Sequence, residues 1–290
     1  MHLTLLVFII ATLFLGYFLL PFAVRLAYRA PRRVETGSPA DAGLPYRTIS
    51  IPTENARQLF SWYIPPPAQA EQAPAVVAMH GWGSNAELML PFAKILHQAG
   101  YATLLVDARN HGRSDADSFS SLPRFAEDLE HAFNWIQKQP EIDSHKIALL
   151  GHSVGGGAAL LVASRRNDAA AVVSIAAFAH PELMMRRHMR SNHIPYALFG
   201  WAVLHYIESA IGVSFDTIAP VNTIQKIHCP VLLIHGRDDR SVPHSDAEAI
   251  YQQRAHRQVK LLTLHGAGHN SIEHIESHGN ELISFLHLYL

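Results

Sequence analysis

The 290-residue sequence has one cysteine, Cys229, and no excess of basic residues. A single cysteine excludes an internal disulfide and a cysteine-rich metal site. The 23 lysines and arginines are balanced by 24 aspartates and glutamates, so the composition gives no support for nucleic-acid binding. The 20 histidines are scattered and form no H-E-x-x-H motif. We therefore expect neither a nucleic-acid partner nor a metal site.

Charged residues are absent from Leu3 to Val24. As a helix, this stretch would extend about 30 Å, the thickness of a membrane hydrocarbon core. It lacks the basic start and clear cleavage site of a signal peptide, so a retained membrane anchor over residues 1–24 is favoured over a cleaved signal or a buried helix. Four arginines follow: Arg25, Arg29, Arg32 and Arg33. The positive-inside rule then predicts a single-pass protein whose following domain is cytoplasmic, at the inner membrane if the source is bacterial.

Residues 25–45 are basic, then rich in Pro, Gly and Ala, and are predicted to be a flexible tether. Beyond it, residues 46–290 alternate short apolar runs with helical stretches. This alternation predicts an α/β fold with a mostly parallel, doubly wound sheet. The runs that we expect to be buried strands are Ala75–Met79, Ala102–Val106, Ile147–Leu150, Ala170–Ala177, Val231–Ile234 and Val259–Leu264. An antiparallel hairpin over residues 46–65 precedes them.

Residues 178–227 interrupt the alternation, because no strand is predicted there. A helix over residues 196–210 carries Trp201, Leu204 and Tyr206, which leave it apolar on most sides. Such a helix should be buried or should face lipid or ligand. A helical cap inserted over the sheet is the interpretation we favour, and an additional core helix is the alternative.

A serine lies among glycines where a predicted strand passes into a predicted helix. Gly151-His152-Ser153-Val154-Gly155 has the G-x-S-x-G pattern of a nucleophile elbow. A turn this tight leaves no room for side chains two positions either side of the serine, which explains Gly151 and Gly155. We predict Ser153 to be a nucleophile.

A serine nucleophile needs a base, an acid that orients the base, and donors for an oxyanion. Asp238 and Asp239 follow one late strand, and His269 follows the last strand. These positions lie at the carboxyl ends of strands, where open α/β sheets place their ligands. The oxyanion donors are expected to be the backbone N–H groups of Val154, after the serine, and Trp82, in an early loop.

These motifs together resemble the α/β-hydrolase superfamily of serine esterases and lipases. The segments that carry the resemblance are "HGWGSN", "DARNHGRSD", "GHSVGG", "HGRDDRSVP" and "GAGHN", and it covers about residues 46–290. Within the superfamily the chain is similar to bacterial membrane-anchored esterases related to the dipeptidyl-aminopeptidase-like group. The family pattern H-G-x-x-D-x-x-V-P falls on His235 to Pro243 and selects Asp239 over Asp238. The resemblance gives His111 a structural role.

The resemblance implies a carboxylesterase-like hydrolase with a Ser153-Asp239-His269 triad and no metal or cofactor. Its substrate would be a small or lipid-derived ester. A thioesterase, lysophospholipase or peptidase using the same triad is an alternative. A membrane-tethered binding protein without catalysis is an alternative of another class.

Overall fold

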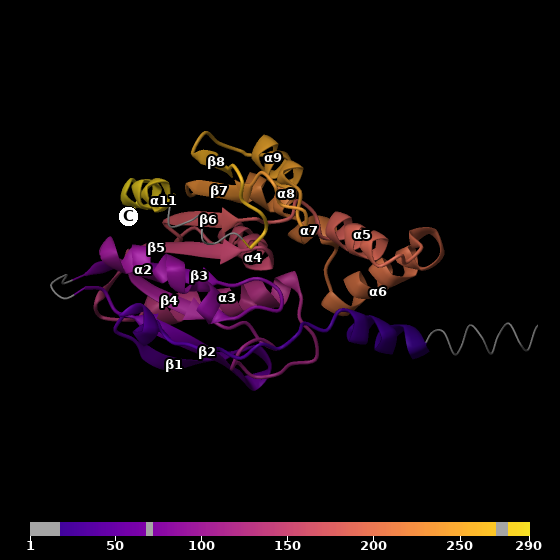
Figure 1. Cartoon of the computed structure of the whole chain (residues 1–290), viewed down its shortest axis with the longest axis horizontal. Helices are drawn as coiled ribbons and strands as arrows, with labels where there is room; N and C mark the ends of the chain where they lie inside the picture. Colours follow the sequence, from indigo (N-terminus) through magenta and orange to yellow (C-terminus); the bar gives the residue numbers. More distant parts are fainter. Residues whose placement is uncertain (1–17, 68–71, 271–277) are drawn as a thin grey trace, which may run out of the picture.

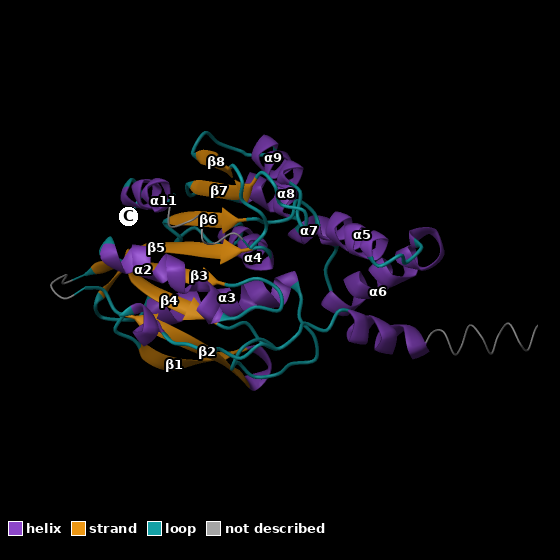
Figure 2. Cartoon of the chain, viewed as in Figure 1, coloured by secondary structure: helices purple, strands orange, loops and turns teal. Residues whose placement is uncertain are grey.

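The computed structural model describes residues 18–67, 72–270 and 278–290. Within these ranges, eight strands form one sheet in the order β1-β2-β4-β3-β5-β6-β7-β8. The pairs β1–β2 and β2–β4 are antiparallel, and all other neighbours are parallel (Figure 2). The predicted α/β class and mostly parallel sheet are therefore confirmed.

The strands are β1 Arg47–Thr53, β2 Arg57–Ile64, β3 Ala73–Met79, β4 Ala102–Val106, β5 Ile142–His152, β6 Ala171–Ile175, β7 Val231–Gly236 and β8 Val259–Leu264. The helices around the sheet are α2 Leu90–Gln98, α3 Leu122–Ile136, α4 Val154–Ala163, α9 His244–Gln252 and α11 Gly279–His287. β4 and β8 match the predicted bounds. β5 begins earlier than its apolar run because polar residues at its start, Asp143 to Lys146, also adopt extended backbone.

Two apolar layers cover the sheet, one on each face. In β3, Ala75, Val77 and Met79 face the layer that contains α3 and α4. Val76 and Ala78 face the opposite layer, which contains α2 and α11. Because successive side chains alternate between faces, a strand buried on both sides must be apolar throughout. The unbroken apolar runs in the sequence have this cause.

Residues between β6 and β7 form a helical insertion that contains no strand in the described structure. Its elements are α5 Pro181–Ser191, the π-helical turn η4 Tyr196–Gly200, α6 Trp201–Ile211, α7 Phe215–Ile218, α8 Pro220–Thr223 and the 3-10 turn η5 Ile224–Lys226. α5 and α6 extend beyond the strand ends at one side of the molecule (Figure 1). We call α5, η4 and α6 the cap.

The predicted anchor falls mostly on residues 1–17, which lie outside the described residues. Its last part belongs to a helix of residues 18–27, drawn in indigo in Figure 1. Across residues 18–67, 72–270 and 278–290, no helix has both the length and the apolar character required to cross a membrane. The anchor therefore stays a prediction.

The segment that we expected to be a flexible tether instead packs against the α/β domain. The Arg32 Nε–H donates to the carbonyl of Gly112 over 3.1 Å, and Asn85 Nδ2 donates to the carbonyl of Arg33 over 3.1 Å. The backbone N–H of Thr36 donates to a Glu87 carboxylate oxygen over 2.8 Å. Loop-like composition did not indicate this packing because the partners lie 51 to 80 residues away in the sequence.

Candidate active site

Ser153 lies between β5 and α4 with a backbone φ of 55°. This left-handed conformation is uncommon for a non-glycine residue and is held here by close packing. A Cβ on Gly151 would lie 2.1 Å from the Gly155 carbonyl oxygen. A Cβ on Gly155 would lie 2.4 Å from the His80 carbonyl oxygen. Both glycines are therefore required by the turn, as the sequence predicted.

His269 joins the serine to a carboxylate. Its Nε2 lies 3.1 Å from Ser153 Oγ, and its Nδ1 lies 2.7 Å from Asp239 Oδ2. Because an ionised carboxylate only accepts hydrogen bonds, Nδ1 carries the proton and Nε2 is free to accept from the serine. This arrangement allows His269 to act as a base toward Ser153.

Asp239 is buried and accepts several hydrogen bonds. Its Oδ1 accepts from the backbone N–H groups of Ser241 and Val242, each over 2.8 Å. Burial alone would raise the pKa of Asp239, but hydrogen bonds from His235, His269 and Val242 outweigh it and hold the pKa well below its ordinary value. Asp239 is consequently an anion at neutral pH. Asp238 is exposed and does not join this cluster.

Val154 and Trp82, whose backbone N–H groups were the expected oxyanion donors, line the cavity beside Ser153. Val154 is the first residue of α4, and this helix has no side-chain cap at its N-terminus. Trp82 follows Gly81, where an added Cβ would lie 3.2 Å from Ser153 Cβ. Within the described structure, neither N–H donates a hydrogen bond. The early loop thus approaches the serine closely and leaves both donors available to an anion.

A cavity of about 700 Å³ opens above Ser153. Val154 and Trp82 lie at its base, and Met184, Met185 and Tyr206 of the cap contribute to its side. This volume is within the range of pockets that enclose small organic ligands. The cap therefore covers the serine.

One aromatic residue of the cap differs from expectation. The Trp201 side chain is 69% exposed and stacks on His205 at 5.1 Å, so it points away from the cavity. Tyr206, Ile207 and Ala210 of the same helix do line the cavity. The helix is apolar on both sides, and the sequence pattern alone did not distinguish the ligand side from the outer side.

Two buried histidines near the serine were not singled out from the sequence. His152 Nε2 donates to the His269 carbonyl oxygen over 2.8 Å, which ties the His269 loop to the elbow. Burial lowers the pKa of His152 to about 4, so this ring is neutral. His235 Nε2 donates to the Val242 carbonyl oxygen over 2.8 Å and lies 3.4 Å from Asp239 Oδ2. The sequence signal that could have identified them is their position. His152 lies inside the G-x-S-x-G pattern, and His235 begins the H-G-x-x-D-x-x-V-P pattern.

The loop after β4 supports the site from outside. His111 is buried, its Nδ1 donates to the Arg109 carbonyl oxygen over 3.0 Å, and its ring packs on Trp82 and Phe125. Arg109 is 2% exposed and its Nε donates to Asp128 over 2.7 Å. These contacts hold the loop after β4 in place, and this loop packs His111 against Trp82 of the loop after β3.

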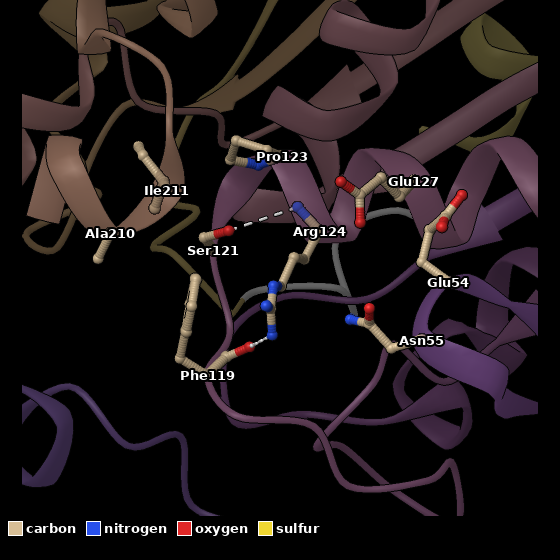
Figure 3. Close-up of a pocket in the computed structure, with 9 residues that line it drawn as sticks. All are labelled: Glu54, Asn55, Phe119, Ser121, Pro123, Arg124, Glu127, Ala210 and Ile211. Atoms are coloured by element: carbon tan, nitrogen blue, oxygen red, sulfur yellow. Dashed lines mark hydrogen bonds between the residues drawn. The ribbon is translucent and has the colours of Figure 1, made fainter.

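A second hollow of about 220 Å³ lies between α3 and the end of α6 (Figure 3). Its main charged group, Arg124, donates to the Phe119 carbonyl oxygen over 2.8 Å and pairs with Asp117 at 2.9 Å. Because this guanidinium is already paired, the hollow has no evident ligand. In the described part of the chain, no group of three or more His, Cys, Asp or Glu side chains is arranged to hold a metal ion.

Comparison with known proteins finds similarity to hydrolases. A family model described as serine aminopeptidase, S33, matches residues 70–208. An uncharacterised protein of Mycobacterium tuberculosis is 26% identical over 228 residues, which cover 78% of this chain and 73% of the relative. The acylamino-acid-releasing enzyme of Rattus norvegicus is 25% identical over 242 residues, covering 77% of this chain and only 32% of that enzyme.

Solved structures show the same fold. An esterase of Pyrococcus furiosus has a TM-score of 0.71 at 24% identity, with 90% of this chain and 97% of that chain covered. Est1E of Butyrivibrio proteoclasticus, with ferulic acid bound, has a TM-score of 0.67 at 20% identity, with 83% and 98% covered. The sheet order, the elbow and these solved structures lead to one assignment: the chain has the α/β-hydrolase fold.

Proposed function

We propose that this chain is a serine hydrolase that cleaves carboxylic esters. Ser153 is the nucleophile, His269 the base and Asp239 the orienting acid, with the N–H groups of Trp82 and Val154 as the oxyanion hole. The observation that carries the proposal is the continuous contact from Ser153 Oγ through His269 to Asp239, with distances of 3.1 and 2.7 Å.

The reaction would proceed through an acyl-enzyme. Ser153 Oγ attacks the ester carbonyl carbon while its proton passes to His269 Nε2, and the carbonyl oxygen becomes an oxyanion. As the oxyanion collapses, the bond to the alcohol oxygen breaks and His269 returns the proton to the leaving alcohol. Water then attacks the acyl-enzyme with the same proton transfers, releasing the carboxylic acid and restoring Ser153.

Peptide hydrolysis is the second candidate, because the matching family model is described as an aminopeptidase and one relative is an acylamino-acid-releasing enzyme. The same triad also suits thioesters and lysophospholipids. Turnover of p-nitrophenyl esters and of aminoacyl p-nitroanilides by the full chain separates these candidates. We expect ester turnover to dominate. Turnover of the anilides alone would favour the peptidase, and turnover of neither would favour a non-catalytic binding protein.

We also keep the membrane association as a proposal, with residues 1–24 as anchor and residues 46–290 as hydrolase domain. Leu3 to Val24 is uncharged, and the described part of this region exposes Phe18, Leu19 and Phe22 at 58%, 52% and 68%. Exposed apolar side chains this close together are typical of contact with lipid or protein. Fractionation of the full chain with membranes that resists alkaline carbonate tests the proposal.

A further inference from the structure

The cavity above Ser153 has one wall that comes from outside the hydrolase core. Phe22 and residues 24–30, at the end of the N-terminal helix and just after it, line this cavity together with Ser153 and the cap. The wall residues used below are Val24, Ala27, Tyr28 and Ala30. Figure 1 shows the N-terminal helix beside α6, beyond the carboxyl ends of the strands.

This wall is held in position at both of its sides. Val24 and Ala30 are 7% and 8% exposed, so they are packed rather than solvated. The Tyr28 ring lies 5.8 Å from the ring of His188 in α5. Directly after the wall, the Arg32 guanidinium donates to the carbonyls of Gly112 and Ser114. The N-terminal helix is thus tied to the cap on one side and to the loop after β4 on the other.

The two sides of the cavity are both rich in apolar groups. Val24, Ala27 and Ala30 belong to the N-terminal wall, and Met185 and Ile207 belong to the cap. Methionine and small aliphatic side chains fit flexible chains of varied shape. An acyl group attached to Ser153 therefore has an apolar space that is bounded by the N-terminal helix as well as by the cap.

We propose that residues 24–30 form a specificity-determining wall of the acyl pocket, and that the preferred substrates are esters of long acyl chains. This inference rests on the proposed ester hydrolysis. Each methylene buried against the wall should raise kcat/KM about fourfold, which corresponds to ~0.8 kcal/mol. The N-terminal helix then selects the substrate, in addition to any role in attaching the protein to a membrane.

Two matched variants of the full chain test the proposal. Ala27 lines the cavity, whereas Ala23, one turn earlier on the same helix, does not, and both are exposed enough to be replaced. Ala27→Trp should lower the ratio of kcat/KM for p-nitrophenyl decanoate to kcat/KM for p-nitrophenyl acetate at least tenfold. Ala23→Trp should leave both unchanged. Equal effects of Ala27→Trp on both esters, or no effect on either, would overturn the proposal.

A gentler variant guards against misfolding. Val24→Ala removes methyl groups from the wall and should lower the ratio of decanoate to acetate turnover several-fold. An unchanged ratio of the two substrates in this variant would also contradict the wall.

Binding separates this inference from the proposed function. Dansylundecanoic acid should bind the wild type and lose at least tenfold in affinity in Ala27→Trp, whether or not the protein hydrolyses esters. If the wild type turns over acetate but neither prefers decanoate nor binds the probe, the wall is wrong and ester hydrolysis stands. If the probe result holds without any ester turnover, the proposed function fails and the wall stands.

Discussion

The elbow around Ser153 and the cavity walls above it are built in different ways. At the elbow, backbone meets backbone: a Cβ on Gly155 would lie 2.4 and 2.5 Å from the carbonyl oxygens of His80 and Met79. In the cap, side chains make the contacts, and α6 leaves Trp201 69% exposed while Leu204 is 6% exposed. The comparison indicates that backbone geometry positions Ser153, whereas replaceable side chains shape the cavity above it.

The largest expected effect lies in the rigid region. Asp239→Asn should lower kcat about 10⁴-fold, because an amide does not hold His269 in the tautomer that accepts the serine proton. Asp238→Asn is the matched control and should stay within twofold, since the Asp238 side chain is exposed. Steady-state ester kinetics with each variant checks this. An inactive Asp238→Asn with an active Asp239→Asn would contradict the assignment.

Acid should destabilise the same region through His152. Folding lowers the pKa of this buried ring to about 4, so the unfolded chain takes up a proton first as the pH falls. The neutral ring therefore contributes stability above about pH 6.5 that is lost toward pH 4, roughly 3 kcal/mol in all. In urea unfolding, the free energy of unfolding of the wild type relative to that of His152→Gln should fall by this amount as the pH is lowered between those two values. A difference that is independent of pH would show that the His152 ring is not both buried and neutral in the folded protein.

The comparison with the variant also isolates His152 from Asp107. Burial and the Glu35 carboxyl raise the pKa of Asp107 to about 8. This shift makes folding more favourable as the pH falls from 8, opposite in sign to His152. Because both proteins retain Asp107, its contribution cancels in the difference.

A smaller loss of stability should follow from an added methyl group at the elbow. Gly155→Ala should cost about 1–3 kcal/mol, since its Cβ meets backbone that cannot move aside. In the same helix, a Cβ on Gly157 would lie 3.2 Å from the end of the flexible Leu122 side chain and 3.6 Å from Pro220 Cγ, and no closer to any backbone atom outside its own helix. Gly157→Ala should therefore be nearly neutral, helped by the higher helix propensity of alanine. Thermal unfolding of both variants tests this contrast in stability. Equal stability of the two variants would contradict it.

The smallest effects should come from the cap. Tyr206→Ala removes a cavity-lining ring and should reduce kcat/KM for long-chain esters about tenfold, with little change for acetate. Trp201→Ala, on the outer side of the same helix, should leave the chain-length profile unchanged. A changed profile in Trp201→Ala alone would reverse the orientation given to α6.

The same contrast explains what the sequence could predict. The elbow depends on glycines and strand ends that are neighbours in the chain, so Ser153 could be identified from a five-residue pattern. His269 was predicted from its place after the last strand. The strand position left Asp238 and Asp239 both open, and only the resemblance to the family pattern selected Asp239. The N-terminal wall gave no such signal, since an apolar stretch followed by arginines has the same composition whether it enters a membrane or packs on a cavity. Contacts such as Arg32 with Gly112 join residues 80 positions apart and leave no local pattern.

The central claim is that Ser153 is an activated nucleophile, and covalent labelling tests it most directly. A fluorophosphonate probe should form a bond to Ser153 Oγ with loss of fluoride, and peptide mass spectrometry should place the label on that residue. Ser153→Ala should remain folded, lose the label, and lose about 10⁴- to 10⁶-fold in ester turnover. A label on another serine, or turnover in Ser153→Ala near that of the wild type, would contradict the account.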